Sequence, residues 1–192
     1  MNVTCLKKYV AAAVCGILLC GCQPTACNPQ PNPGEKGGLL AIFYQLNNVT
    51  TAAPSYQTVI WLEDADGNYV KSAMVSEYLS YGGYNKPEIC PTWSQTANWR
   101  QVSKSEFDAV TAATPDLGQN TVIIDCKEQN LPPGVYFYCV QTHVIEDYNI
   151  LYRGKITIGK GDAENIAKVT YMPGKRPGTE HCLSNVKARY CH

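Results

Sequence analysis

The sequence lacks an excess of charge of either sign. Sixteen Lys and Arg residues balance sixteen Asp and Glu residues, and charged residues make up 17% of the 192 positions, against about 25% in an average globular protein. A domain that binds nucleic acid carries a basic patch or a strongly basic total. We therefore predict no nucleic-acid partner.

Signatures of common enzymes are also missing: the chain has no nucleophile elbow, no paired-carboxylate signature and no phosphate-binding loop. It contains three histidines. His181-Cys182 and Cys191-His192 offer ligand types for a metal, but their spacing matches no compact metal motif. We predict no metal site and no enzyme activity. An enzyme that acts through His143 or through the C-terminal His and Cys residues is the least favoured alternative.

Beyond the N-terminus, no segment is apolar enough to span a bilayer. Lys7 and Lys8 precede an apolar run from Tyr9 to Cys20, which is typical of a signal peptide and too short for a spanning helix. The junction Leu19-Cys20-Gly21-Cys22 resembles a bacterial lipobox. We predict a lipoprotein signal peptide over residues 1–21 and lipidation of Cys22, which tethers the chain to a membrane of the bacterial cell envelope, on the periplasmic or outer-membrane face. The alternatives are an ordinary secretory signal and a membrane-anchoring helix.

A Pro-, Asn- and Gly-rich stretch follows the signal and predicts a flexible spacer over residues 22–38. One folded domain is then expected over residues 39–192, a usual size for a single core. Without the signal the chain keeps 14 basic and 16 acidic residues. Six cysteines remain after lipidation, and an exported compartment favours disulfides among them, although Cys27 in the spacer can equally stay unpaired. They are Cys27, Cys90, Cys126, Cys139, Cys182 and Cys191.

The domain shows recurrent strand patterns. Apolar and polar residues alternate with a period of two, and the turn residues Asp66-Gly67 and Pro132-Pro133-Gly134 separate the runs. Helix signals are weak, and the best of them covers Lys104 to Thr111. We therefore predict an all-β fold, an antiparallel immunoglobulin-like β-sandwich of about seven to eight strands. The expected strands are 39–46, 58–63, 69–75, 121–126, 135–144, 150–158, 166–171 and 186–190.

The same alternation constrains the cysteines. In the strand 135–144, the residues Tyr136, Tyr138 and Val140 share the more apolar face, which turns Cys139 and His143 to the other side. Cys126 lies on the apolar side of its own strand. Cys126 and Cys139 should therefore point to opposite faces, and a disulfide between them is excluded.

A long segment between two predicted strands, residues 76–101, is rich in aromatic residues and has no regular pattern. Long loops inside compact domains are often functional, and Tyr, Trp and Arg suit recognition of proteins, rings or sugars. The alternative is that these residues cover one end of the sandwich. The candidate partner-binding residues are Tyr78, Tyr81, Tyr84, Trp93, Trp99 and Arg100.

Four segments in order resemble a known family: "TVIWLEDADGNYVKSAMV", "FDAVTAATP", "LPPGVYFYCVQTHV" and "YRGKITIG". They look like the predicted periplasmic family catalogued as domain of unknown function 2271. The resemblance implies a small exported protein without a known catalytic set that accompanies extracytoplasmic redox proteins and flavin transferases. Cys90 and the paired C-terminal cysteines depart from the family pattern.

The stretch from Asp108 to Thr114 resembles the flavinylation motif of respiratory flavin subunits, in which an Asp and a Ser or Thr precede Gly, Ala and a Thr that carries FMN through a phosphoester. Thr111 matches the inner hydroxyl residue and Thr114 matches the acceptor. Ala112 replaces the usual Gly, which would be strained if the backbone needed a positive φ. The alternative is a small-residue turn in which Asp108 or Thr111 caps a short helix.

The leading hypothesis is a membrane-tethered, non-catalytic accessory protein of an extracytoplasmic redox or flavin-linked system. It either carries covalent FMN on Thr114 or serves partners that do, such as a flavin transferase or a membrane redox protein. The alternative is a surface binding or structural lipoprotein that engages a protein or glycan through the aromatic segment.

Overall fold

The structure is a computed structural model that describes residues 38–50 and 53–192. The predicted signal peptide, Cys22, Cys27 and the spacer up to residue 37 lie outside the described residues. Ten strands occur in the described part. They are β1 (Leu39–Leu46), β2 (Gln57–Glu63), β3 (Tyr69–Ser76), β4 (Thr111–Ala112), β5 (Gly118–Asp125), β6 (Gly134–Ile145), β7 (Tyr148–Ile158), β8 (Ala163–Ile166), β9 (Lys168–Met172) and β10 (Leu183–Cys191).

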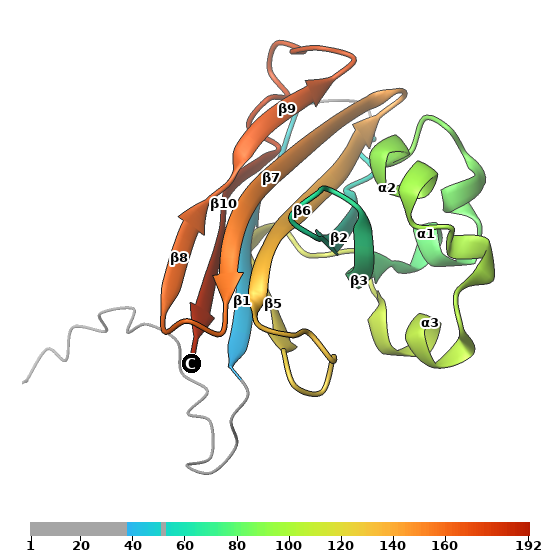
Figure 1. The fold of residues 1–192 in the computed structure, drawn as a ribbon. Coiled ribbons are helices and arrows are strands. Elements are labelled where there is room, and N and C mark those ends of the chain that lie inside the picture. Colours follow the sequence, from blue (N-terminus) through green and yellow to red (C-terminus); the bar gives the residue numbers. More distant parts are fainter. Residues whose placement is uncertain (1–37, 51–52) are drawn as a thin grey trace, which may run out of the picture. The chain divides into compact units, whose positions relative to one another are not determined.

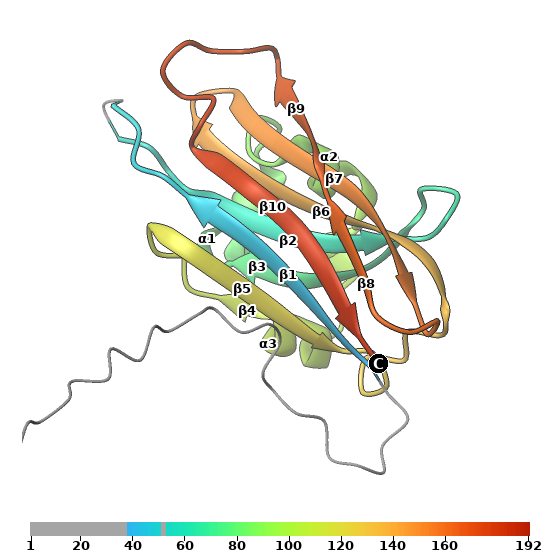
Figure 2. The same cartoon turned by 90° about the vertical axis from the view of Figure 1, so that its left-hand side faces the viewer.

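The strands form two sheets that face each other (Figures 1 and 2). One has four strands in the order β5-β1-β10-β8, and the other has six in the order β4-β3-β2-β6-β7-β9. All pairs are antiparallel except the short parallel pair of β3 with β4. The prediction of an all-β sandwich is confirmed.

The strand count is higher than the seven to eight predicted, for two reasons. The segment expected to be one strand over residues 166–171 changes sheets: Ile166 ends β8 in one sheet, Lys168 begins β9 in the other, and the N–H of Ala167 between them donates to Val186 O at 3.0 Å. In addition, β4 has two residues, which is too short for an alternation signal.

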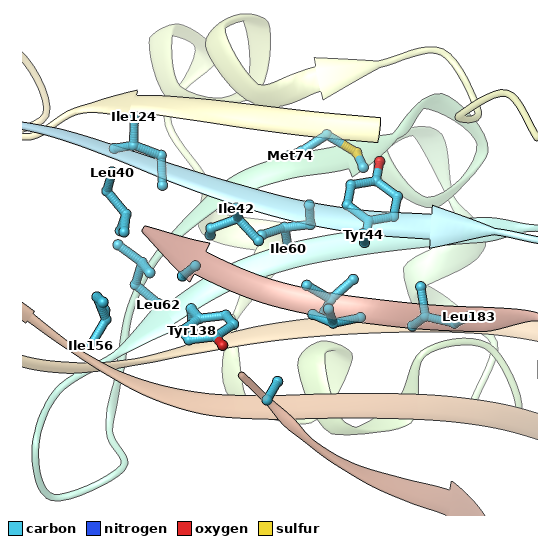
Figure 3. Close-up of a cluster of buried hydrophobic side chains, with 14 of the residues drawn as sticks. Leu40, Ile42, Tyr44, Ile60, Leu62, Met74, Ile124, Tyr138, Ile156 and Leu183 are labelled. Atoms are coloured by element: carbon cyan, nitrogen blue, oxygen red, sulfur yellow. The ribbon is translucent and has the colours of Figure 1, made fainter. Parts of the chain in front are cut away.

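The inner core fills the space between the sheets, and we call it the inner cluster. It holds 25 buried residues that come from both sheets, among them Leu40, Ile42, Ile60, Leu62 and Tyr138 (Figure 3). Burying side chains of this size contributes about 1.5–3 kcal/mol each before entropic costs. The inward positions are the alternate positions expected from the sequence, because successive strand residues point to opposite faces.

A helical insertion connects β3 to β4 and covers the outer face of the six-stranded sheet (Figure 1). The sequence predicted an irregular loop over most of this segment, and that prediction is wrong. The sequence pattern does not predict these helices because each is shorter than two turns, and because Gly82 and Pro91 interrupt the segment. The helix expected at Lys104 is confirmed, with its end at Val110. The elements are α1 (Glu77–Tyr81), η1 (Gly83–Asn85), α2 (Pro91–Thr96), η2 (Trp99–Gln101) and α3 (Lys104–Val110).

The insertion buries a second apolar core, the outer cluster, against the sheet. Trp61 from β2 and Cys139 from β6 meet Leu79, Trp93 and Trp99 from the insertion. All five are buried. Within the described residues, every helix is too short or too polar to cross a bilayer.

Candidate functional site: the groove beside Thr114

The predicted flavinylation motif begins on α3. Ser103 caps this helix, and its hydroxyl accepts from the Glu106 N–H at 3.1 Å. Asp108 lies on the exposed side and forms an ion pair with Lys104 four residues earlier, at 2.6 Å. The capping role considered for Asp108 therefore belongs to Ser103 instead. An exposed pair of this kind contributes little to stability.

Thr111 and Ala112 form the edge strand β4, in parallel register with Val75 and Ser76 of β3. The Thr111 hydroxyl donates to the Ser80 hydroxyl of α1 at 2.9 Å, so the motif is tied both to the sheet and to the insertion. Ala112 takes a strand conformation, which alanine adopts without strain. The replacement of the usual Gly at this position therefore carries no backbone penalty here.

Thr114 lies on the exposed loop after β4. Its hydroxyl oxygen accepts a hydrogen bond from Gln57 Nε2 at 3.0 Å, and the same Nε2 also donates to Ser55 O at 3.3 Å. An amide nitrogen only donates. Gln57 therefore fixes the Thr114 oxygen as an acceptor and leaves the hydroxyl proton free to pass to an incoming base.

The Thr114 hydroxyl opens onto an exposed groove formed with α1 and the start of η1. The groove has a volume of about 610 Å³ and is lined by Thr114, Glu77, Tyr78, Tyr81, Gly82 and Gly83. We call it the Thr114 groove. It brings together two features that are more than 30 residues apart in the sequence, the candidate acceptor and two of the candidate aromatic residues.

The two tyrosines of the groove are exposed but held in place. Tyr81 is 71% exposed and stacks edge-on against Phe107 of α3, with ring centroids 5.1 Å apart. Tyr78 is 44% exposed, and Lys86 Nζ lies 5.5 Å from its ring centroid. A Cβ at Gly83 would come within 2.7 Å of the Tyr78 ring, so glycine permits this close packing. Each ring thus combines protein support with surface that is open to a ligand.

The other candidate partner-binding residues lie outside the Thr114 groove. Trp93 and Trp99 are buried, with ring centroids 5.2 Å apart, and form part of the outer cluster. They have the covering role that the sequence left open, but they cover the outer face of the six-stranded sheet instead of one end of the sandwich. Tyr84 is half-buried and Arg100 is exposed, and both line a second groove on the insertion.

Comparison with known proteins gives one match. A family model described as a predicted periplasmic protein, DUF2271, matches residues 42–172. The chain belongs to the DUF2271 family. The match runs from β1 to the end of β9, and so includes the whole insertion and the Thr114 groove. No curated protein and no solved structure matches the chain significantly.

His143 of this DUF2271 chain lies deeper than the sequence indicated. It is 6% exposed, and both ring nitrogens have partners: Nδ1 lies 2.5 Å from the Ser55 hydroxyl and Nε2 lies 2.7 Å from Glu146 O. Because a carbonyl oxygen only accepts, Nε2 carries a proton. Ser55 in turn contacts Gln57, so His143 supports the strand end from which Gln57 reaches Thr114.

The predicted disulfides do not form among the cysteines that the structure describes: no pair among Cys90, Cys126, Cys139, Cys182 and Cys191 is linked. Cys126 and Cys182 lie in the inner cluster, whereas Cys90 and Cys139 lie in the outer one. The narrower prediction that Cys126 and Cys139 face opposite sides is confirmed. Residue counts and compartment favour pairing, but pairing also needs adjacent Cβ atoms, which the sequence does not reveal.

Burial shifts the pKa values of four of these thiols upward. It raises the pKa of Cys126 to about 11 and that of Cys182 to about 12, and it raises the pKa values of Cys90 and Cys139 still further from their ordinary value. A thiol with so high a pKa carries almost no thiolate at neutral pH, and only the thiolate is reactive. These four cysteines act as small apolar residues.

The sequence did not identify several residues that shape the site, above all Gln57 and Gly83. Gln57 directly precedes the strand predicted over residues 58–63 and is the first residue of the observed β2, and a single polar residue before a strand carries no alternation signal. The adjacent Gly82-Gly83 pair was the available signal, because consecutive glycines inside an aromatic segment favour a tight turn with close packing.

Proposed function

We propose that this protein is an exported, non-catalytic accessory protein of an extracytoplasmic redox or flavin-linked system, tethered to the membrane through Cys22, and that Thr114 accepts a covalently attached FMN. The description of the DUF2271 family as periplasmic supports the compartment. The observation that carries the proposal is that the exposed Thr114 hydroxyl shares a groove with two exposed tyrosine rings.

The acceptor reaction needs an accessible nucleophile. Thr114 Oγ would attack the phosphorus on the FMN side of the FAD pyrophosphate, in the active site of a flavin transferase. The new Oγ–P bond forms as the P–O bond to AMP breaks, AMP leaves, and the hydroxyl proton passes to a base of the transferase. Ala112 and Ala113 are small and exposed, so they let the pocket of the transferase close over the loop.

The groove also suits the attached group. An isoalloxazine ring is flat and aromatic, and aromatic pairs gain about 0.5–1.5 kcal/mol beyond the burial of area. Tyr81 and Tyr78 supply ring surface beside Thr114, within a volume of about 610 Å³. A flavin on Thr114 would stay exposed along one edge, as exchange of electrons with a membrane partner requires.

The test is intact mass and visible absorbance of the domain from Leu39 onward, made in an exporting host together with a flavin transferase. We expect one added FMN in the wild type and in Thr114→Ser, and none in Thr114→Ala. Thr170→Ala, which removes another exposed threonine, should keep the modification. The proposal fails if no mass is added while the transferase modifies a known acceptor in the same cells.

A second variant separates attachment from docking of the ring. Tyr81→Ala should still acquire FMN, because the acceptor is unchanged, but flavin fluorescence should rise because less of the ring is stacked. Equal fluorescence in the two proteins would mean that the tyrosines do not hold the flavin.

A further inference from the structure

A second groove lies on the helical insertion and shares no residue with the Thr114 groove. We call it the Arg100 groove. It has a volume of about 290 Å³, at the lower end of the range of about 300–1,000 Å³ for small-molecule pockets. Its lining contains one cation and no carboxylate. The polar and aromatic lining residues are Tyr84, Asn85, Ser94, Gln95, Asn98, Trp99 and Arg100.

Arg100 is oriented before any ligand arrives. Its Nε donates to Asn85 Oδ1 at 3.0 Å, and its Nη2 donates to the same oxygen. Arg100 has no acidic partner among the residues that the structure describes. A guanidinium held along one edge presents its remaining N–H groups as a fixed fork, which matches a carboxylate in a bidentate way.

The base of the groove is rigid. Trp99 is 3% exposed, donates its indole N–H to Ser80 O at 3.2 Å, and packs against Trp93. Beside it, Asn98 adopts a left-handed backbone with φ 44°, and its side chain donates to Gln101 Oε1 at 2.9 Å. Side chains on such a base lose little entropy when they bind a ligand.

We propose that the Arg100 groove binds an acidic sugar, with the carboxylate on Arg100 and the ring hydroxyls on the amide and hydroxyl groups of Asn85, Ser94, Gln95 and Asn98. Amides and hydroxyls both donate and accept, as sugar hydroxyls do. Half-buried Tyr84 offers an apolar ring beside them. An acidic peptide would use the guanidinium but would leave most of these groups without partners, and the small volume favours a single sugar ring.

The test uses D-galacturonate as the probe, D-galactose as its neutral counterpart and NMR of the ¹⁵N-labelled domain. The chain has three tryptophans, so each indole N–H gives one signal. Saturable addition of galacturonate should shift the Trp99 signal and leave the Trp61 signal unmoved. Galactose should bind at least about tenfold more weakly, because it lacks the charge-assisted contact.

Variants complete the test. Arg100→Gln should weaken galacturonate binding at least about tenfold, and Asn85→Ala should weaken it less. Arg176→Gln serves as the control, because Arg176 is exposed, pairs with Glu146 and lies outside the groove. Three results would overturn the proposal: no saturable shift at millimolar galacturonate, equal binding by Arg100→Gln, or equal affinity for glutarate, which offers a carboxylate without a sugar ring.

Discussion

Both faces of the six-stranded sheet are buried. The other sheet covers the inner face and the helical insertion covers the outer face, and different interactions hold these two layers in place. The inner face meets the other sheet through an almost wholly apolar cluster. The outer face meets the helical insertion through apolar contacts and through buried polar side chains. Gln141 Oε1 accepts from Trp93 N at 3.2 Å, Asn149 Oδ1 accepts from Cys90 N at 2.9 Å, and Ser72 Oγ accepts from the Trp93 indole at 2.9 Å.

Apolar contact does not depend on direction, whereas a hydrogen bond fixes two atoms relative to each other. The hydrogen bonds therefore give the insertion one position on its face, and between the two sheets the Tyr138 hydroxyl of β6 fixes one such contact by donating to Asn165 O of β8 at 2.7 Å. The difference teaches that polar residues at alternate strand positions do not always mark a solvent face. They can mark the docking site of a segment that satisfies them.

The largest loss of stability is expected from a substitution on the inner face of the sheet. Ile60 and Val59 are neighbours on β2, fully buried in the inner and outer clusters respectively. Ile60→Ala should lower the free energy of unfolding by about 2–5 kcal/mol, since the cavity cannot collapse. Urea denaturation measures the loss. Val59→Ala should cost less, because it removes two carbons instead of three. A larger loss for Val59→Ala would mean that the outer cluster dominates stability.

A smaller loss of stability, confined to the insertion, is expected from substitution of Asn149. Besides accepting from Cys90, it donates to Glu88 O at 2.9 Å. Asn149→Ala leaves the buried Cys90 N–H without a partner and should cost about 1–3 kcal/mol. Hydrogen exchange should rise in residues 83–101 and remain unchanged in β1 and β10. A uniform rise across the chain would contradict a directional attachment.

Thiol labelling compares the two faces without any mutation. At low urea concentration, Cys90 and Cys139 should react with iodoacetamide before Cys126 and Cys182, because the insertion opens before the sandwich unfolds. Mass spectrometry of the peptides gives the order. Simultaneous labelling of all four would show that the two faces open as one cooperative unit.

The smallest effect concerns the turn between β2 and β3, where Asp64 lies outside both clusters. Hydrogen bonds from the Asn68 side chain and backbone lower the pKa of Asp64. A lowered folded pKa means that the stabilisation is present above the unfolded pKa, near 4, and is lost as the pH falls through the folded value. Asp64→Ala should therefore be slightly less stable than the wild type at pH 7, and this difference in Tm should shrink at lower pH.

Much of the sandwich was predictable, because alternation reports which residues share a face. The strand at Leu39–Leu46 and the start of α3 at Lys104 were located correctly. The outer cluster was not, since Cys139 and His143 lie on the less apolar side of their strand and no local pattern says what covers them. The meeting of Thr114 with Tyr78 and Tyr81 was also beyond the sequence, because it depends on where the insertion docks.

The short parallel pair of β3 with β4 has a consequence for how this family can vary. The chain leaves the sheet at Ser76 and returns beside the same strand, with Ala112 opposite Ser76, so the ends of the insertion lie about 4.8 Å apart, one strand spacing. Both ends of the insertion are therefore attached at the same edge of the six-stranded sheet. Attachment at this edge would let the length of the insertion change without altering the register of any other strand pair.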